Sequence, residues 1–294
     1  MYKRQLSDPG DPLLNRTISG DLYHPGSTFK LVMTAAALES GQYTGSSRLP
    51  NPSSLQLPGS DSVIGNSGGG RCGGGSEVSI ADALRLSCNI PFAELGRELG
   101  YETIAAQASA FGFGDESLEI PLPVTASLYP PVESEAQLML ASFGQGNVRV
   151  TPLQMAMVSA AIANGGTLLR PYLVDSITAP DLSVLEAPEP TVYSTPISPD
   201  TAAMMTAMMI QNVANGAAFN ATIEGVDVAG KTGTAQNGEG EPYTLWFTGF
   251  APADDPEIAV AVVVEGGGGL GQAGFGNTVA APIAKRVIEA VLSE

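Results

Sequence analysis

Apolar residues recur every three or four positions over several stretches of the chain, and segments rich in glycine and proline separate these stretches. This spacing predicts a helix over residues 27–40, which Pro25-Gly26 precedes and Gly41 follows. It predicts further helices at about residues 79–87, 91–99, 102–110, 134–142, 151–163 and 199–214. We expect the methionines of the last of these helices to fill the core.

The pattern changes in the last third of the chain, where short apolar runs alternate with turn residues. Residues 226–236, 243–253 and 257–267 are interpreted as three strands. Because the connections between them are short, the strands should form an antiparallel meander. A last amphipathic helix, at about residues 278–292, would cover one face of the sheet. Together these elements predict an α+β fold.

Two segments differ from this pattern. Residues 42–76 are rich in Gly, Ser and Pro, and we expect them to form a long surface loop within one domain. Residues 1–10 contain the basic stretch MYKRQ and are interpreted as an unstructured remnant. The remaining residues, 11–294, are predicted to form one domain, because no repeat or clear linker divides them.

Composition narrows the classes of function. The 294 residues include 30 acidic and 13 basic ones, and the formal net charge of −17 argues against a nucleic-acid or anionic-membrane surface. No apolar run approaches the length of about 20 residues that a bilayer span needs. The single histidine, His24, excludes a multi-histidine metal site. Cys72 and Cys88 could form a disulfide or stay free, and the sequence leaves both possibilities open.

The first candidate for chemistry is the pair Ser27 and Lys30, three positions apart at the start of a predicted helix. Both side chains would emerge on one face of that helix. A serine hydroxyl is a weak nucleophile until a base removes its proton, and a lysine with a lowered pKa is such a base. The Ser27 N–H could also stabilise an oxyanion. By itself, S-x-x-K is equally compatible with a capped surface helix.

Ser87 and Asn89 form a second candidate motif, S-x-N, in the predicted break between two helices. A hydroxyl placed there could relay a proton, and an amide could hold a peptide bond of a substrate. Taken alone the motif is weak, because serine and asparagine are common between helices.

A third motif, K-T-G-T, begins at Lys231 on a predicted strand. Thr232 and Thr234 could bind a carboxylate, and Gly233 would let a substrate backbone approach. The Thr234 N–H could complete an oxyanion hole with that of Ser27. The alternative is an edge strand that its lysine protects from aggregation.

In this order and context, S-x-x-K, S-x-N and K-T-G are typical of penicillin-recognising acyl-serine proteins. Other stretches agree, among them SFGQGNVRVTPLQMAMVSAAIANGG, AGKTGTAQ and WFTGFAPA. From Asp11 onward the chain resembles the transpeptidase domain of class B penicillin-binding proteins, in particular an actinobacterial type. Gly144-Gln145-Gly146 is especially typical of this class.

The resemblance implies a penicillin-binding or serine beta-lactamase-like fold, with an antiparallel sheet flanked by helices and an all-helical part. It implies a serine D,D-transpeptidase that cross-links peptidoglycan stem peptides through an acyl-enzyme, is acylated by beta-lactams, and needs no cofactor or metal. Its catalytic residues would be the nucleophile Ser27, the base Lys30, the proton relay Ser87, the substrate contact Asn89, and Lys231. Thr232, Gly233 and Thr234 would bind substrate, and Ser27 and Thr234 would form the oxyanion hole.

The same resemblance implies peptidoglycan precursor strands, beta-lactams and a SEDS-family glycosyltransferase as partners. The site would face outward from the bacterial cell membrane, with the anchor absent from this chain. A D,D-carboxypeptidase, a serine beta-lactamase, a non-catalytic beta-lactam sensor and an inactive fragment stay open as alternatives. A class A beta-lactamase is disfavoured, because neither Glu133 nor Glu135 stands in an E-x-x-L-N sequence.

The chain departs from the family pattern at three places. The second motif reads S-C-N, Thr244-Leu245 stand where His-Ala is usual, and the strands that precede S-x-x-K in the family are missing. We therefore expect only about three strands of the usual sheet, with an exposed edge.

Near the motifs, four residues are assigned structural rather than chemical roles. His24 is expected to pack at the rim, Trp246 and Phe247 in the core, and Cys88 as a small apolar filler.

Overall fold

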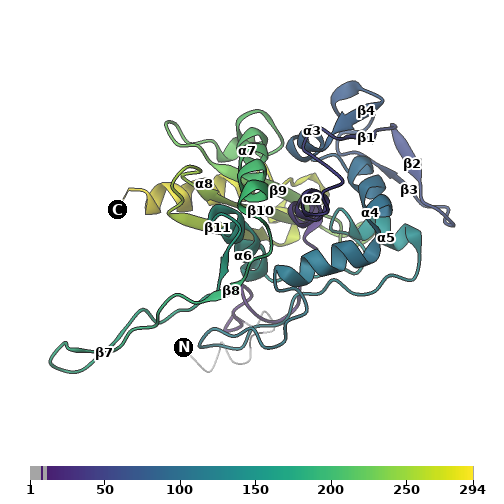
Figure 1. Ribbon diagram of the computed structural model, residues 1–294. Coiled ribbons are helices and arrows are strands. Elements are labelled where there is room, and N and C mark those ends of the chain that lie inside the picture. Colours follow the sequence, from purple (N-terminus) through teal and green to yellow (C-terminus); the bar gives the residue numbers. More distant parts are fainter. Residues whose placement is uncertain (1–7, 9–11, 294) are drawn as a thin grey trace.

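A three-stranded antiparallel sheet lies at the centre of the C-terminal part of the computed structural model (Figure 1). Its strands are β9 (Ala229–Ala235), β10 (Thr244–Ala251) and β11 (Ile258–Val264), in the order β11-β10-β9. The predicted meander is confirmed. The structure describes residue 8 and residues 12–293, so the predicted remnant at residues 1–10 lies almost wholly outside the described residues.

Helices cover both faces of this sheet. On one side α8 (Ala280–Val291) packs on β10 and β11, and on the other α6 (Pro152–Ala163) and α7 (Pro199–Asn215) contact the strands. All eight residues of β10 are buried as a result. Neighbouring residues of β10 enter different apolar clusters: Trp246 joins the larger one and Phe247 the one beneath α8, which confirms both as core residues.

The remaining helices form the all-helical part. They are α2 (Lys30–Glu39), α3 (Ile80–Arg85), α4 (Ile90–Ala110) and α5 (Glu135–Ala141), close to the predicted ranges. The first helix is preceded by a short 3₁₀ turn, η1 (Gly26–Phe29). The two helices predicted at 91–99 and 102–110 are joined in α4, which Gly100 interrupts at φ +75°. Of the methionines of α7, Met205, Met208 and Met209 are buried as expected, whereas Met204 is exposed.

Residues 42–76 are less loop-like than predicted. Strand β1 (Arg48–Pro50) pairs with β4 (Glu77–Ser79), and β2 (Ser54–Gln56) pairs with β3 (Val63–Gly65), before a short turn, η2 (Cys72–Gly74). The segment also buries side chains, namely those of Leu49, Asn51, Leu57 and Asn66. The prediction of a surface loop was therefore wrong in part. The segment has the composition of a loop, but a few buried side chains, spaced along it, hold it against the rest of the protein.

A long hairpin between α6 and α7 was not predicted. Strand β5 (Leu168–Leu169) pairs with β8 (Val192–Ser194) at its base, and β6 (Ile177–Thr178) pairs with β7 (Val184–Glu186) near its tip. Figure 1 shows this hairpin arm, residues 168–194, projecting away from the body of the molecule. Its strands are only two or three residues long, too short for a clear alternation of apolar and polar residues.

The sheet has an open edge. Among the described residues no strand pairs with the outer edge of β11, and each residue of β11 is partly exposed, in agreement with the expected three strands. The short 3₁₀ turns η3 (Phe219–Ala221), η4 (Gly266–Gly269) and η5 (Gly271–Ala273) complete the described fold. Within residues 12–293, no helix has the length and apolar character that crossing a membrane requires.

Candidate active site

Ser27 lies in the short turn η1, immediately before α2. Gly26 adopts a positive φ of +52°, and its N–H donates to the Gly144 carbonyl at 3.0 Å. A Cβ atom on Gly144 would lie only 2.0 Å from the Gly26 carbonyl oxygen, so no side chain fits there. Gly144, the first residue of the Gly144-Gln145-Gly146 stretch, thus lies directly against the serine turn and accepts a hydrogen bond from it.

Lys30 is fully buried and connects the first two motifs. Its Nζ donates to Ser27 Oγ at 3.0 Å, to Asn89 Oδ1 at 2.8 Å and to the Ser87 carbonyl at 2.9 Å. Burial, and then the nearby charge of Lys231, lower the pKa of Lys30 well below its usual value. A neutral Lys30 amine is at hydrogen-bonding distance to accept the Ser27 proton.

Ser87 and Asn89 occupy the break between α3 and α4, as predicted. Ser87 has a left-handed backbone, with φ +60°, a conformation that costs a residue with a side chain about 1–2 kcal/mol. In this conformation its carbonyl accepts from Lys30 while its hydroxyl accepts from Lys231 Nζ at 2.8 Å. Ser87 is therefore hydrogen-bonded to both buried lysines and connects them.

Strand β9 carries the third motif. Lys231 is fully buried, and burial lowers its pKa to about 7. The Thr232 hydroxyl donates to the Ala217 carbonyl at 3.0 Å, so its proton is already engaged. The Thr234 hydroxyl accepts from the Gly276 N–H at 3.1 Å, which leaves its own proton available to a ligand. Of the two threonines predicted to bind a carboxylate, Thr234 has the more suitable geometry.

Gly233 has a packing role that the sequence did not indicate. A Cβ atom at this position would lie 2.8 Å from the Pro25 carbonyl oxygen and 3.2 Å from the Thr28 methyl carbon. The serine turn therefore rests directly on β9, and the missing side chain is required by this contact. Approach of a substrate backbone, the predicted reason for the glycine, is not needed to explain it.

The predicted catalytic residues thus meet in one place, although Ser27 and Lys231 are more than two thirds of the chain apart in the sequence. Hydrogen bonds through Lys30 and Ser87 connect all five: Ser27, Lys30, Ser87, Asn89 and Lys231. The two lysines are buried, whereas Ser27, Ser87, Asn89 and Thr234 are partly exposed. Such a site presents hydroxyls to a ligand and keeps the amines away from water.

The hydrogen bonds of His24 lead away from Ser27. Its Nδ1 lies 2.8 Å from Nη1 of Arg149, and its carbonyl accepts from the Trp246 indole N–H at 2.9 Å. Burial and the charge of Arg149 lower the pKa of His24 to about 4, so the ring is neutral at physiological pH. These contacts fit the expected packing position at the rim.

The two cysteines are bonded to each other. The Cys72–Cys88 disulfide, with a Cα–Cα distance of 5.8 Å, links the segment 42–76 to the middle residue of S-x-N. This resolves the question that the sequence left open. The expectation that Cys88 serves only as apolar filler was incomplete, because the residue is buried and also forms this covalent tie.

Cavity volume does not identify the site. One cavity of about 780 Å³ is lined by residues 116–124 and 170–172, and another of about 610 Å³ lies between α6, the base of the hairpin arm and the start of β11. In the described part of the chain, neither cavity is lined by a motif residue. The chemistry of the converging side chains identifies the site instead.

Comparison with known proteins identifies the family of the chain. Residues 1–289 match the family model of the penicillin binding protein transpeptidase domain. The chain is 42% identical over 301 aligned residues to the peptidoglycan D,D-transpeptidase PbpA of Mycolicibacterium smegmatis, and 40% identical over 294 to PbpA of Mycobacterium tuberculosis. These alignments include 100% and 99% of this chain, and the chain spans about 60% of the length of these relatives.

Solved structures give the same result. A ceftriaxone acyl-enzyme complex of penicillin-binding protein A from M. tuberculosis superposes with a TM-score of 0.94 at 40% identity, over 99% of this chain and 65% of that one. The D,D-transpeptidase domain of a peptidoglycan glycosyltransferase from Eggerthella lenta has a TM-score of 0.88 at 33% identity, over 99% of this chain and 70% of that one. The chain therefore belongs to the penicillin-binding protein transpeptidase family and has its α+β fold.

Proposed function

We propose that this chain is a serine D,D-transpeptidase domain that cross-links peptidoglycan stem peptides and is acylated by beta-lactams. The observation that carries the proposal is the contact of buried Lys30 Nζ with Ser27 Oγ, in a network that also includes Ser87, Asn89 and Lys231. The names of the relatives, peptidoglycan D,D-transpeptidases, and the beta-lactam complexes of the similar structures support it.

In the first half of the reaction, neutral Lys30 takes the proton of Ser27, and Ser27 Oγ attacks the carbonyl carbon between the two terminal D-alanines. The N–H groups of Ser27 and Thr234 stabilise the resulting oxyanion. The C–N bond then breaks, and the leaving nitrogen receives the proton of the Ser87 hydroxyl, which Lys231 replaces through their hydrogen bond, while Lys30 keeps the proton of Ser27. Free D-alanine departs and an ester to Ser27 remains.

Lys231 and Thr234 are suited to hold the terminal carboxylate of the donor peptide. Lys231 supplies positive charge next to the Ser87 hydroxyl. The Thr234 hydroxyl accepts from the Gly276 N–H, so its own proton can be donated to the carboxylate. Asn89 would hold the peptide backbone of the donor. These assignments extend to beta-lactams, which carry a carboxylate beside the reactive amide.

In the second half, an amine of a neighbouring strand attacks the ester and restores free Ser27. The amine passes one proton through the Ser87 hydroxyl back to Lys231, Lys30 returns its proton to Ser27, and one new amide bond replaces the one that was broken. A beta-lactam acylates the same serine, but after its ring opens the leaving nitrogen remains covalently attached to the acyl group. Because it cannot depart from the site, the ester to Ser27 is cleaved slowly.

The partners and the location of the whole protein are also proposals. The resemblance to class B penicillin-binding proteins supports peptidoglycan precursor strands as substrates and a SEDS-family glycosyltransferase as a partner. It also supports a location of the site on the outer side of the bacterial cell membrane. The excess of acidic residues, with a net charge of −17, agrees with a partner that is not nucleic acid. Co-purification of the glycosyltransferase with this protein from its native cells would test the assignment.

Labelling with a fluorescent penicillin tests the activity of the site. We expect one label per folded chain, mapped by mass spectrometry to the peptide that contains Ser27, and no label on Ser27→Ala. A folded wild-type chain that takes no label would contradict the proposal and favour an inactive fragment.

Further assays separate the acyl-serine alternatives. A stoichiometric burst with nitrocefin is expected, whereas rapid turnover would indicate a beta-lactamase. Release of D-alanine from a stem pentapeptide without a cross-linked product, even when an acceptor amine is supplied, would indicate a carboxypeptidase. A stable adduct with no reaction on any stem peptide would indicate a sensor.

A further inference from the structure

The break that carries Ser87 and Asn89 lies between two helix ends. The last carbonyls of α3 and the first N–H groups of α4 lack partners within their own helices, so other groups must satisfy them. The side chain of Asn89 cannot cap α4, because it contacts Lys30 and the Gly65 carbonyl instead. The geometry of the break therefore depends on groups from elsewhere in the chain.

Asn66 caps the start of α4. Its Oδ1 accepts from the Asn89 N–H at 2.9 Å and from the Ile90 N–H at 3.1 Å, and the residue is almost fully buried. On its other side, its Nδ2 donates to the Gly70 carbonyl at 3.1 Å. A residue 23 positions earlier in the chain thus performs the task of an N-cap side chain.

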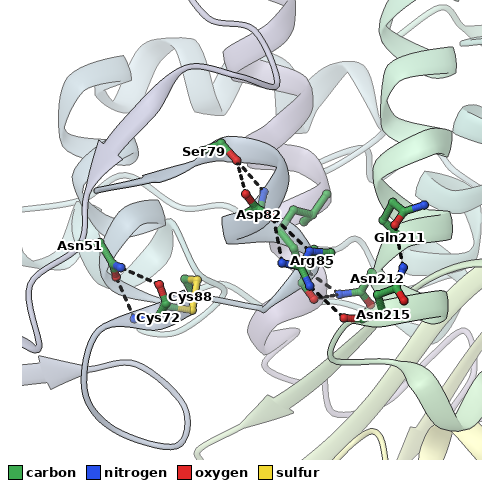
Figure 2. Close-up of polar contacts among 10 residues, drawn as sticks. Asn51, Cys72, Ser79, Asp82, Arg85, Cys88, Gln211, Asn212 and Asn215 are labelled. Atoms are coloured by element: carbon green, nitrogen blue, oxygen red, sulfur yellow. Dashed lines mark hydrogen bonds and ion pairs between the residues drawn. A yellow bond between two sulfur atoms is a disulfide. The ribbon is translucent and has the colours of Figure 1, made fainter. Parts of the chain in front are cut away.

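The segment that carries Asn66 is itself held in place. Asn51 is fully buried, donates to the Cys72 carbonyl at 2.7 Å and the Gly75 carbonyl at 2.9 Å, and accepts from the Cys72 N–H at 3.1 Å. Figure 2 shows Asn51 on the backbone of Cys72, next to the disulfide to Cys88. Asn66 therefore projects from a segment that is fastened both by hydrogen bonds and by a covalent bond.

Asn212 caps the end of α3 from the opposite side. This fully buried residue of α7 donates through Nδ2 to the Leu84 carbonyl at 3.1 Å and the Arg85 carbonyl at 2.7 Å (Figure 2). The Arg85 carbonyl also accepts from the Ala217 N–H at 2.9 Å, and the Ala217 carbonyl accepts from Thr232. The same contacts therefore connect the end of α3 to the K-T-G strand.

We propose that Asn66 and Asn212 are the positioning residues of the second motif: they cap the two helix ends and so hold Ser87 and Asn89 against Lys30 and Lys231. The inference rests on the proposed acyl-serine function. The left-handed Ser87 is an unfavourable conformation that its surroundings must maintain. A shift of about 1 Å in a reacting group can lower a rate about 100-fold, so loosening either helix end should slow acylation.

The test compares Asn66→Ala and Asn212→Ala with a matched control, Gln107→Ala. Gln107 is also a buried amide on α4, and it donates to the Pro196 carbonyl at 2.8 Å near the far end of that helix. The acylation rate constant and the preceding dissociation constant are measured separately with benzylpenicillin. We expect each asparagine variant to acylate about 10- to 100-fold more slowly, with a dissociation constant within about threefold of wild type. The control should acylate within about twofold of wild type.

Hydrogen–deuterium exchange of residues 86–92 gives a second measurement that does not depend on the reaction. We expect faster exchange there in Asn66→Ala and Asn212→Ala, and wild-type exchange in Gln107→Ala. Unchanged acylation in both asparagine variants, or equal slowing in the control, would overturn the inference. If either alanine variant fails to fold, the corresponding serine variant is measured by the same criteria.

The exchange measurement also separates this inference from the proposed function. A wild-type chain that is not acylated would contradict the function, and exchange would then decide the inference by itself. Faster exchange at residues 86–92 in the asparagine variants would still support positioning, and unchanged exchange would overturn it.

Discussion

The candidate active site and the hairpin arm differ in where their charged and apolar side chains lie. In the site two lysines, Lys30 and Lys231, are 0% exposed, and they donate three and two hydrogen bonds, respectively. In the arm, large apolar residues face solvent, with exposed fractions of 81% for Leu182, 63% for Val184 and 67% for Leu185. Burying an amine costs free energy unless nearby groups form hydrogen bonds with it. Replacing an exposed apolar side chain changes the stability of the protein little, because the side chain is already in water.

Substitutions should therefore have different effects in the two regions. In the site, each buried lysine is hydrogen-bonded to more than one group, so a substitution of one residue also disturbs its hydrogen-bond partners. In the arm, residues at the tip contact little, so substitutions there should act alone and weakly. We therefore expect strong effects from substitutions in the site and weak ones from substitutions at the tip of the arm.

The largest effect is expected for Lys30→Ala. Removal of a positioned general base lowers rates by about 10²- to 10⁴-fold, and we expect the rate of penicillin acylation at Ser27 to fall in that range. The matched control is Lys285→Ala on α8, whose partner is Glu289 at 3.8 Å on the surface. Stopped-flow labelling measures both variants, and a Lys30→Ala protein that acylates as fast as Lys285→Ala would remove Lys30 from its assigned role.

Gly144→Ala should destabilise the protein and disturb the serine turn. The added methyl group would overlap the Gly26 carbonyl, and Gly144 has a φ of +80°, so we expect the free energy of unfolding to fall by about 3 kcal/mol. Gly165→Ala is the control, since it has a φ of +59° but open space where the methyl group would go. That variant should lose only about 1 kcal/mol.

Urea denaturation measures the stability of both glycine variants, and penicillin labelling of the folded fraction measures the site. The acylation rate should fall in Gly144→Ala and stay near wild type in Gly165→Ala. Equal losses of stability in the two variants would show that backbone conformation, rather than contact with the serine turn, explains Gly144.

The pH dependence of acylation should be bell-shaped. Lys30 must be neutral, so the rate should rise with pH until Lys30 has lost its proton, at a pH well below the usual lysine value. Lys231 should be charged to bind the carboxylate, so the rate constant at low penicillin concentration should fall above a pH of about 7. Each limb should approach a tenfold change per pH unit.

A Lys231→Arg variant tests the assignment of the alkaline limb. Its guanidinium stays charged, so the fall above neutral pH should disappear or move to higher pH even if the maximum rate is lower. An alkaline limb that stays in place in this variant would assign that limb to another group.

The smallest effect is expected at the tip of the arm. Leu182→Ser should change the free energy of unfolding by less than about 0.5 kcal/mol and leave acylation unchanged. Leu168→Ala, at the base of the same arm but only 1% exposed, should cost about 2–5 kcal/mol. Thermal and urea melts compare them, and a loss above 1 kcal/mol for Leu182→Ser would show that the tip has a structural role.

Several features of this protein could be determined from the sequence alone. The periodicity of residues 27–40, 151–163 and 199–214 predicted their helices, because helix formation depends on residues three and four positions apart. The meander of β9, β10 and β11 followed from short connections, and the S-x-x-K, S-x-N and K-T-G motifs led to the family. All of these signals are local, so they can be seen without knowledge of which segments meet.

How residues far apart in the sequence act on one another became visible once the chain was folded. It paired Cys72 with Cys88, placed Asn66 and Asn212 on the two helix ends, and set Gly233 against the Pro25 carbonyl. Nothing in the local sequence of these residues marks them, because a capping amide or a missing Cβ has its effect on a segment far away in the chain. The burial that lowers the lysine pKa values also arises only when the helices and the sheet pack together.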